Sequence, residues 1–146
     1  MSDTPVEIPL PLQAIIDEFS WAEGREKLEL LLEYSEKMPP LPDWLNKNSN
    51  MDQVHECMTP VFVHAQTENG GMHFYFDIPP ESPTVRGYAA LLSEGLDGAS
   101  PEQVVAVPSN FYMDMGLHKV LTTQRLHGIG AILAYLKRLA TKELAG

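Results

Sequence analysis

Two stretches of alternating apolar and polar residues predict a β-hairpin over residues 60–78. Residues 60–66 and 72–78 both follow the period of two expected of a strand with one buried face. Asn69-Gly70 lies between them, and this pair favours the positive φ angles of a two-residue type I′ turn. Such a turn sets the register of the two strands. The expected pairs on the apolar face are Val61 with Ile78, Val63 with Phe76 and Ala65 with Phe74.

Apolar residues with a helical period predict two helices before the hairpin. The first covers Pro9 to Phe19, with Leu12, Ile15 and Ile16 on its buried face. The second is expected to start at a capping box, in which Ser20 and Glu23 bond each other's backbone N–H groups, and to end before Pro39-Pro40. Its buried stripe is predicted to contain Leu28, Leu31, Leu32 and Met38.

Cap residues predict three more helices after the hairpin. Ser82-Pro83 and Ser100-Pro101 each combine an N-cap serine with a proline suited to the first helical position. The last helix is expected to begin with Thr122 or Thr123 as its cap and to run to about Leu139. We therefore predict an α+β fold, in which a small antiparallel sheet packs against several helices, as one domain over residues 1–146 with a disordered tail at 1–8. A third strand within 52–56 has weaker support.

Charge and composition narrow the classes of partner. Twenty acidic residues oppose ten basic ones, giving a net charge of −10. Nucleic acids and anionic membrane surfaces bind clustered Lys and Arg, so neither is an expected partner. The first residues lack the basic and apolar regions of a secretory signal, no run is long enough to span a membrane, and a single cysteine suits a reducing compartment. We expect a cytoplasmic protein.

Cys57 is the one cysteine, and it lies just ahead of the first hairpin strand. A single cysteine excludes an internal disulfide and a cysteine-rich metal or iron–sulfur site built by one chain. Two interpretations remain: a reactive thiol presented by a rigid sheet, or a small buried apolar side chain. His55 would favour the thiolate, whereas the negative charge of Glu56 would disfavour it.

Other candidate sites have weaker signals. The five histidines lack metal-ligand spacing, so we expect no metal, and Gly70-Gly71 lies in a hairpin turn where no phosphate loop belongs. Gly128 and Gly130 fall inside the last helix, where we expect them to permit close approach of another segment. Arg125 lies in the first turn of that helix, where the helix dipole favours acidic residues, and this invites a functional interpretation.

Several motifs, in their order and spacing over most of the chain, resemble the SufE family of sulfur-acceptor proteins. They are Trp21, Arg25, Leu30-Leu31, Leu41-Pro42, Cys57 followed by Val61-Phe62, Glu68-Asn69-Gly70 with Met72-His73-Phe74, Val85-Arg86-Gly87, Ser100-Pro101-Glu102-Gln103, and Leu121-Thr122-Thr123-Gln124-Arg125 before Gly128.

This resemblance implies a SufE/IscU-like fold and a role for Cys57 as persulfide acceptor. The sulfur donor would be a SufS-like cysteine desulfurase, which carries pyridoxal phosphate, and the recipient a SufBCD-like scaffold for iron–sulfur cluster assembly. The chain itself would need no cofactor and would act as a carrier and activator, with a homodimer possible, rather than as an enzyme. Arg125 matches a family arginine near the acceptor, where it would support the thiolate or grip the desulfurase.

The resemblance also places residues around the acceptor. Glu56 and Met58 stand where family members have a glycine and a polar residue, and we expect Glu56 to slow sulfur acceptance unless it points away or meets Arg125. Met58, Val61 and the loop at 41–50 are candidates for a cover over the thiol. Two alternatives remain: a regulatory module that docks on a desulfurase without carrying sulfur, and a cysteine hydrolase with a histidine base.

Overall fold

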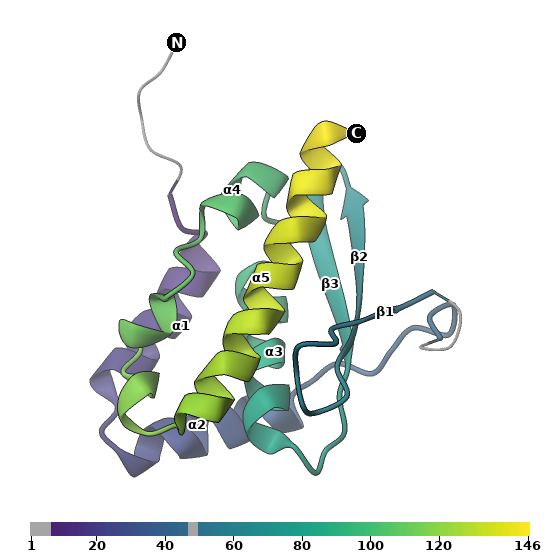
Figure 1. The fold of residues 1–146 in the computed structure, drawn as a ribbon. Coiled ribbons are helices and arrows are strands. Elements are labelled where there is room, and N and C mark those ends of the chain that lie inside the picture. The colour runs from purple at the N-terminus through teal and green to yellow at the C-terminus, as the bar shows by residue number, and fades with distance from the viewer. Residues whose placement is uncertain (1–6, 47–49) are drawn as a thin grey trace.

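The computed structural model describes residues 7–46 and 50–146 (Figure 1). The expected tail at 1–8 therefore lies mostly outside the described residues. The described parts of the chain form five α-helices, two 3-10 helices and three strands. In chain order these are α1 (Leu10–Trp21), α2 (Arg25–Glu36), β1 (Asp52–Gln53), β2 (Phe62–Glu68), β3 (Gly71–Asp77), α3 (Pro83–Gly95), α4 (Pro101–Ala106), η1 (Phe111–Met113), η2 (Leu117–Lys119) and α5 (Thr123–Ala145).

The predicted hairpin is confirmed in position, turn and register. β2 pairs with β3 antiparallel, and Val63 and Ala65 face Phe76 and Phe74 as expected. Asn69 and Gly70 have φ angles of 53° and 80°, the positive values that a type I′ turn requires. The short β1 pairs with the other side of β2, which gives the antiparallel order β1-β2-β3 and confirms a third strand.

Helix α3 lies at the centre of the molecule. It packs against β3 and also against α1, α2 and α5 (Figure 1). Gly87 allows the close approach of α2, because a Cβ at this position would lie 2.1 Å from the Leu31 carbonyl oxygen. The apolar face of the hairpin and the helices thus share one core, which confirms the α+β class. No helix in the described parts of the chain is long and apolar enough to cross a membrane.

The junction between α1 and α2 differs from the predicted capping box. Ser20 remains inside α1, where its hydroxyl donates to the Asp17 carbonyl, and Gly24 with φ 42° is the N-cap of α2. The Nζ of the buried Lys27 donates to the Phe19 carbonyl and so satisfies the end of α1. The N-cap of α2 therefore has no side-chain cap bond, and the predicted Ser20–Glu23 capping box is wrong.

Other helix predictions hold with smaller corrections. The Ser100–Gln103 capping box is confirmed with both of its bonds, and Thr122 caps α5, which continues to Ala145 rather than ending near Leu139. In α2 the buried stripe runs through Leu31, Tyr34 and Ser35, whereas Leu32 is 46% exposed. The stripe is rotated because α2 packs against the small residues of α3.

Candidate functional site

Cys57 lies on a short loop between β1 and β2. The backbone N–H of Val54 donates to the carbonyl of Val61 at 2.9 Å and closes this loop, and both valine side chains are buried. Inside the loop, the Cys57 N–H reaches back to the Val54 carbonyl at 3.4 Å. Two buried anchors and one closing bond therefore hold a cysteine at the edge of the core, beside α5 (Figure 1).

The Cys57 thiol is half-buried and hydrogen-bonded to the backbone of α5. Its Sγ donates to the carbonyl oxygen of Gly128 at 3.2 Å. Burial, and secondarily the carboxylate of Glu56, raises the pKa of Cys57 to about 11. A carbonyl oxygen accepts from a thiol and repels a thiolate, so this bond also favours the protonated form. At pH 7 roughly one molecule in ten thousand would carry the thiolate.

A cavity of about 270 Å³ lies beside the Cys57 loop. Its lining comes from the Cys57 loop and the first turns of α5: Glu56, Met58, Thr59, Thr123, Gln124, His127 and Gly128. Met58 is 83% exposed, and the side-chain amide of Gln124 contacts its sulfur. An exposed methionine at the rim of a cavity offers an adaptable apolar contact to a partner.

The expected cover over the thiol is only partly observed. Met58 lies at the rim of the cavity, and Val61 is fully buried beneath the loop. The described part of the 41–50 loop lies elsewhere, because Trp44 packs edge-on against His64 and Tyr75 on the outer face of the sheet. Residues 47–49 of this predicted cover lie outside the described residues.

Arg125 reaches the start of α3 rather than the thiol. Its Nη1 donates to the hydroxyl of Thr84 at 2.9 Å. It forms no ion pair with Glu56, since the ion pairs among the described residues are Arg25–Glu29 and His73–Asp97. Of the two conditions that would relieve the expected effect of Glu56, a meeting with Arg125 is not observed. Arg125 has no acidic partner among the described residues and lies on the same side of the molecule as the Cys57 loop.

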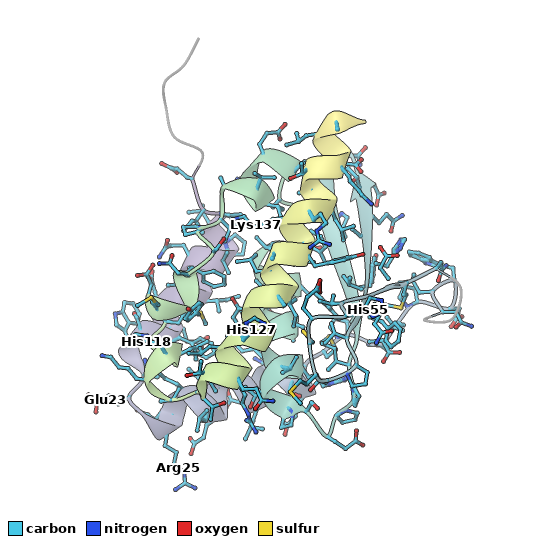
Figure 2. All side chains as sticks on the ribbon, viewed as in Figure 1. Glu23, Arg25, His55, His118, His127 and Lys137 are labelled. Carbon is cyan, nitrogen blue, oxygen red and sulfur yellow. The ribbon has the colours of Figure 1, made fainter. Side chains whose placement is uncertain are left out.

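The two remaining predicted neighbours of the thiol are exposed. His55 lies on the loop beside α5 (Figure 2) and makes no hydrogen bond to Cys57. Glu56 is exposed, and its negative charge adds to burial, the larger cause, in raising the pKa of Cys57. The loop therefore brings together a protonated thiol and a carboxylate, without a histidine base in contact.

Sequence reasoning missed the role of Gly128 as the acceptor of the thiol hydrogen bond. We expected this glycine and Gly130 to permit close packing, yet an added Cβ at either position would meet no atom within 4 Å. The contact uses the Gly128 carbonyl, which every residue type has. A link between positions 57 and 128 leaves no local pattern in the sequence. Thr84, the partner of Arg125, was missed for the same reason.

The described residues contain no group of three or more His, Cys, Asp or Glu side chains arranged to hold a metal ion. The fold and site thus define a class: small α+β proteins that keep one sheltered thiol on a loop between two strands.

Comparison with known proteins identifies the family within that class. Residues 13–140 match the model of the SufE family, described as an Fe-S metabolism associated domain, and the chain belongs to this family. An uncharacterized SufE-like protein of Mycobacterium tuberculosis is 37% identical over 135 residues, which cover 92% of this chain and 94% of that protein. The cysteine desulfuration protein SufE of Plasmodium vivax is 28% identical over 119 residues, which cover 80% of this chain and 46% of that protein.

A solved structure supports the fold. The solution structure of a hypothetical protein from Thermus thermophilus has a TM-score of 0.83 and 40% sequence identity, and it covers 96% of this chain and all of that one. The resemblance and the α+β fold inferred from the sequence are both confirmed.

Proposed function

We propose that this protein accepts sulfur from a cysteine desulfurase on Cys57. Membership of the SufE family and the likeness to a cysteine desulfuration protein support this role. The observation that carries it is the position of Cys57: one thiol on an anchored loop, sheltered by α5, with a cavity beside it. A carrier needs such a thiol, protected from oxidants in the free protein and accessible to a docked donor.

The transfer is a thiol exchange that needs no oxidant or reductant. The Cys57 thiol loses its proton, and the thiolate attacks the outer sulfur of the desulfurase persulfide. The sulfur–sulfur bond of the desulfurase breaks as the new bond to Cys57 forms. The desulfurase cysteine leaves as a thiolate and takes up a proton, and the chain then carries the persulfide.

Docking must change the surroundings of Cys57 for this step to be fast. With a pKa of about 11, the thiol is almost fully protonated at neutral pH. Withdrawal of Sγ from the Gly128 carbonyl, and a cation from the partner near Glu56, would both lower this pKa. Arg125, held at the same side of the molecule by Thr84, would meet an acidic group of the desulfurase. We therefore assign it to docking rather than to direct support of the thiolate.

The second half of the proposed role is delivery to an iron–sulfur scaffold. Without a second cysteine in the chain, no internal disulfide can discharge the persulfide. The sulfur therefore stays on Cys57 until an external acceptor attacks it. A reducing cytoplasm and a SufBCD-like scaffold are the setting that we propose.

A docking module that carries no sulfur is the second candidate. The raised pKa of Cys57 favours it, because a protonated thiol is a weak nucleophile. The exposed Met58 favours it as well, since it offers an apolar contact to a partner. A cysteine hydrolase is disfavoured, since His55 makes no hydrogen bond to the thiol that would let it act as the base.

Intact-mass spectrometry after incubation with a cysteine desulfurase and L-cysteine tests the proposal. We expect the protein to gain the mass of one sulfur atom, the gain to be reversed by a reductant, and Cys57→Ser to gain nothing. Desulfurase turnover is measured in the same samples. If Cys57→Ser stimulates desulfurase turnover as much as the natural protein does, the carrier proposal is overturned in favour of the docking module. Binding without added sulfur in the natural protein would also overturn the carrier.

A further inference from the structure

The outer edge of β3 is the free edge of the sheet. In a hairpin with a two-residue turn, Gly71 and every second residue after it hydrogen-bond to the partner strand. The alternate residues of β3 therefore direct their backbone N–H and C=O groups away from β2. These residues are Met72, Phe74, Phe76 and, just past the strand, Ile78.

Both ends of this edge are occupied by the protein itself. Met72 exchanges backbone bonds of 2.7 and 2.8 Å with Ala99 and Gly98. The hydroxyl of Ser93 donates to the Phe74 carbonyl at 2.9 Å, and the guanidinium of Arg86 donates to the Ile78 carbonyl at 2.5 Å.

The middle of the edge lacks hydrogen-bond partners, although Phe74 and Phe76 are each 3% exposed. No group in the described parts of the chain bonds the outward N–H of Phe74 or the outward N–H and C=O of Phe76. Unpaired backbone groups at a protein interior are costly, so these three require water or a ligand.

The open stretch lines a cleft of about 310 Å³ between β3, α3 and the end of α2. This volume is at the lower end of the range for ligand sites in proteins. Its lining includes the ring of Tyr34, with the Lys37 ammonium 5.2 Å from the ring centre, and Glu94.

The cleft is lined by charges of both signs, including the Lys37 ammonium and the Glu94 carboxylate. Glu94 is exposed and forms no ion pair with any residue that the structure describes. Burial raises the pKa of Tyr34, and the nearby carboxylates of Glu18 and Glu94 raise it further. Asp97 at the rim is already paired with His73 at 2.5 Å. Glu94 is thus the acidic group that remains for an incoming cation.

We infer that this cleft binds a short extended segment of a partner protein that carries a lysine or arginine, added as a strand on the open edge of β3. The N–H groups of Phe74 and Phe76 donate to the segment, and the Phe76 carbonyl accepts from it. The basic side chain pairs with Glu94. Backbone bonds supply affinity in such strand addition, and the side-chain contact supplies selectivity.

The edge cleft and the Cys57 site lie at opposite ends of α3. Thr84, which holds Arg125, is in the first turn of this helix, and Glu94 is in its last turn. Ten helical residues separate the two by about 15 Å along the axis. A partner on the β3 edge therefore leaves the Cys57 loop open. The inference does not depend on sulfur transfer.

Amide hydrogen exchange in the free protein is the first test. We expect the N–H groups of Phe74 and Phe76 to exchange faster than that of Tyr75, which is bonded to β2. Equal protection of all three would overturn the open edge. If the N–H groups of Phe74 and Phe76 are protected only at high protein concentration, the edge binds a second copy of the chain. This result would overturn the proposal of a partner segment.

Titration with a blocked peptide, acetyl-Thr-Val-Lys-Val-Thr-amide, is the second test. We expect amide shifts and slower exchange at Phe74 and Phe76, with no change at Gly128. Replacement of the peptide's lysine by glutamate is expected to weaken binding roughly tenfold. N-methylation of its central backbone amide is expected to remove binding.

The charge variant Glu94→Lys completes the test. This variant is expected to stop binding the lysine peptide and to bind the glutamate peptide. Glu143→Lys makes an equal charge change at another exposed helix position and is expected to leave both affinities unchanged. The proposal fails if neither peptide shifts the two amides, if both bind equally, or if lysine amide alone gives the same shifts as the peptide.

Discussion

The hairpin and the Cys57 loop are neighbours in the chain, yet their conformations have different origins. The hairpin follows from its own residues: alternation places Val63 and Phe76 inside, and Asn69-Gly70 sets the turn. The state of the Cys57 thiol depends chiefly on its burial beside α5, where it donates to the carbonyl of Gly128, 71 positions away. Structure is therefore encoded locally in this region, whereas the reactivity of the thiol is set by a distant part of the chain. Four measurements test this contrast.

Truncation of the buried hairpin face should have the largest effect on stability. Phe76 is 3% exposed, so Phe76→Ala is expected to lower the free energy of unfolding by about 3 to 5 kcal/mol. Cys57→Ala removes a smaller, half-buried group and is expected to cost less than about 1.5 kcal/mol. Urea unfolding of both variants measures the difference. Equal losses would mean that the loop is part of the folding core.

Alkylation of Cys57 by iodoacetamide should show how strongly α5 suppresses the thiolate. Because the folded pKa of about 11 exceeds the unfolded value, the native protein keeps its proton over a pH range in which the unfolded chain has lost it. At pH 8.5 we expect native alkylation to be roughly a hundredfold slower than in urea. The native rate should keep rising up to about pH 11. A plateau near pH 9 would show that the folded protein does not raise the pKa of Cys57.

Two glycines with open space at Cβ should respond to alanine with opposite signs. Gly70 has φ 80° in the hairpin turn, so Gly70→Ala is expected to cost about 1 to 2 kcal/mol. Gly128 lies inside a helix, and Gly128→Ala is expected to stabilise the protein by up to about 1 kcal/mol.

The Gly128→Ala variant also separates backbone from side-chain effects at the site. Its carbonyl remains, so the alkylation rate of Cys57 should stay within about twofold of the natural one if helix geometry is kept. Thermal unfolding and alkylation of both variants check the pair. If Gly128→Ala destabilises the protein, the close packing at Gly128 that the sequence suggested would be supported after all.

Neutralisation of Glu56 should have the smallest effect. Its carboxylate is the second cause of the raised Cys57 pKa, after burial. Glu56→Gln is therefore expected to shift the pH profile of alkylation downward by less than about one unit, since exposed charges are screened by solvent. Glu102→Gln, on the exposed surface of α4, serves as the control. Equal profiles for Glu56→Gln and the natural protein would assign the whole shift to burial.

The sequence by itself determined the elements whose signals lie within a few residues. The strand period, the Asn69-Gly70 turn and the Ser100–Gln103 capping box each describe groups that bond close along the chain, so pattern and outcome agree. The family resemblance likewise rests on motifs in fixed order, and Cys57 could be singled out because it is the one cysteine.

Tertiary structure alone decided what these elements do to one another. It placed Lys27 on the Phe19 carbonyl, buried Cys57 against Gly128, and turned Arg125 toward Thr84. It also left the middle of the β3 edge beside a cleft that Glu94 lines. Each of these arrangements depends on groups outside the local sequence pattern. Proton affinity and docking chemistry depend on those surroundings, which are specified only when the core brings the elements together.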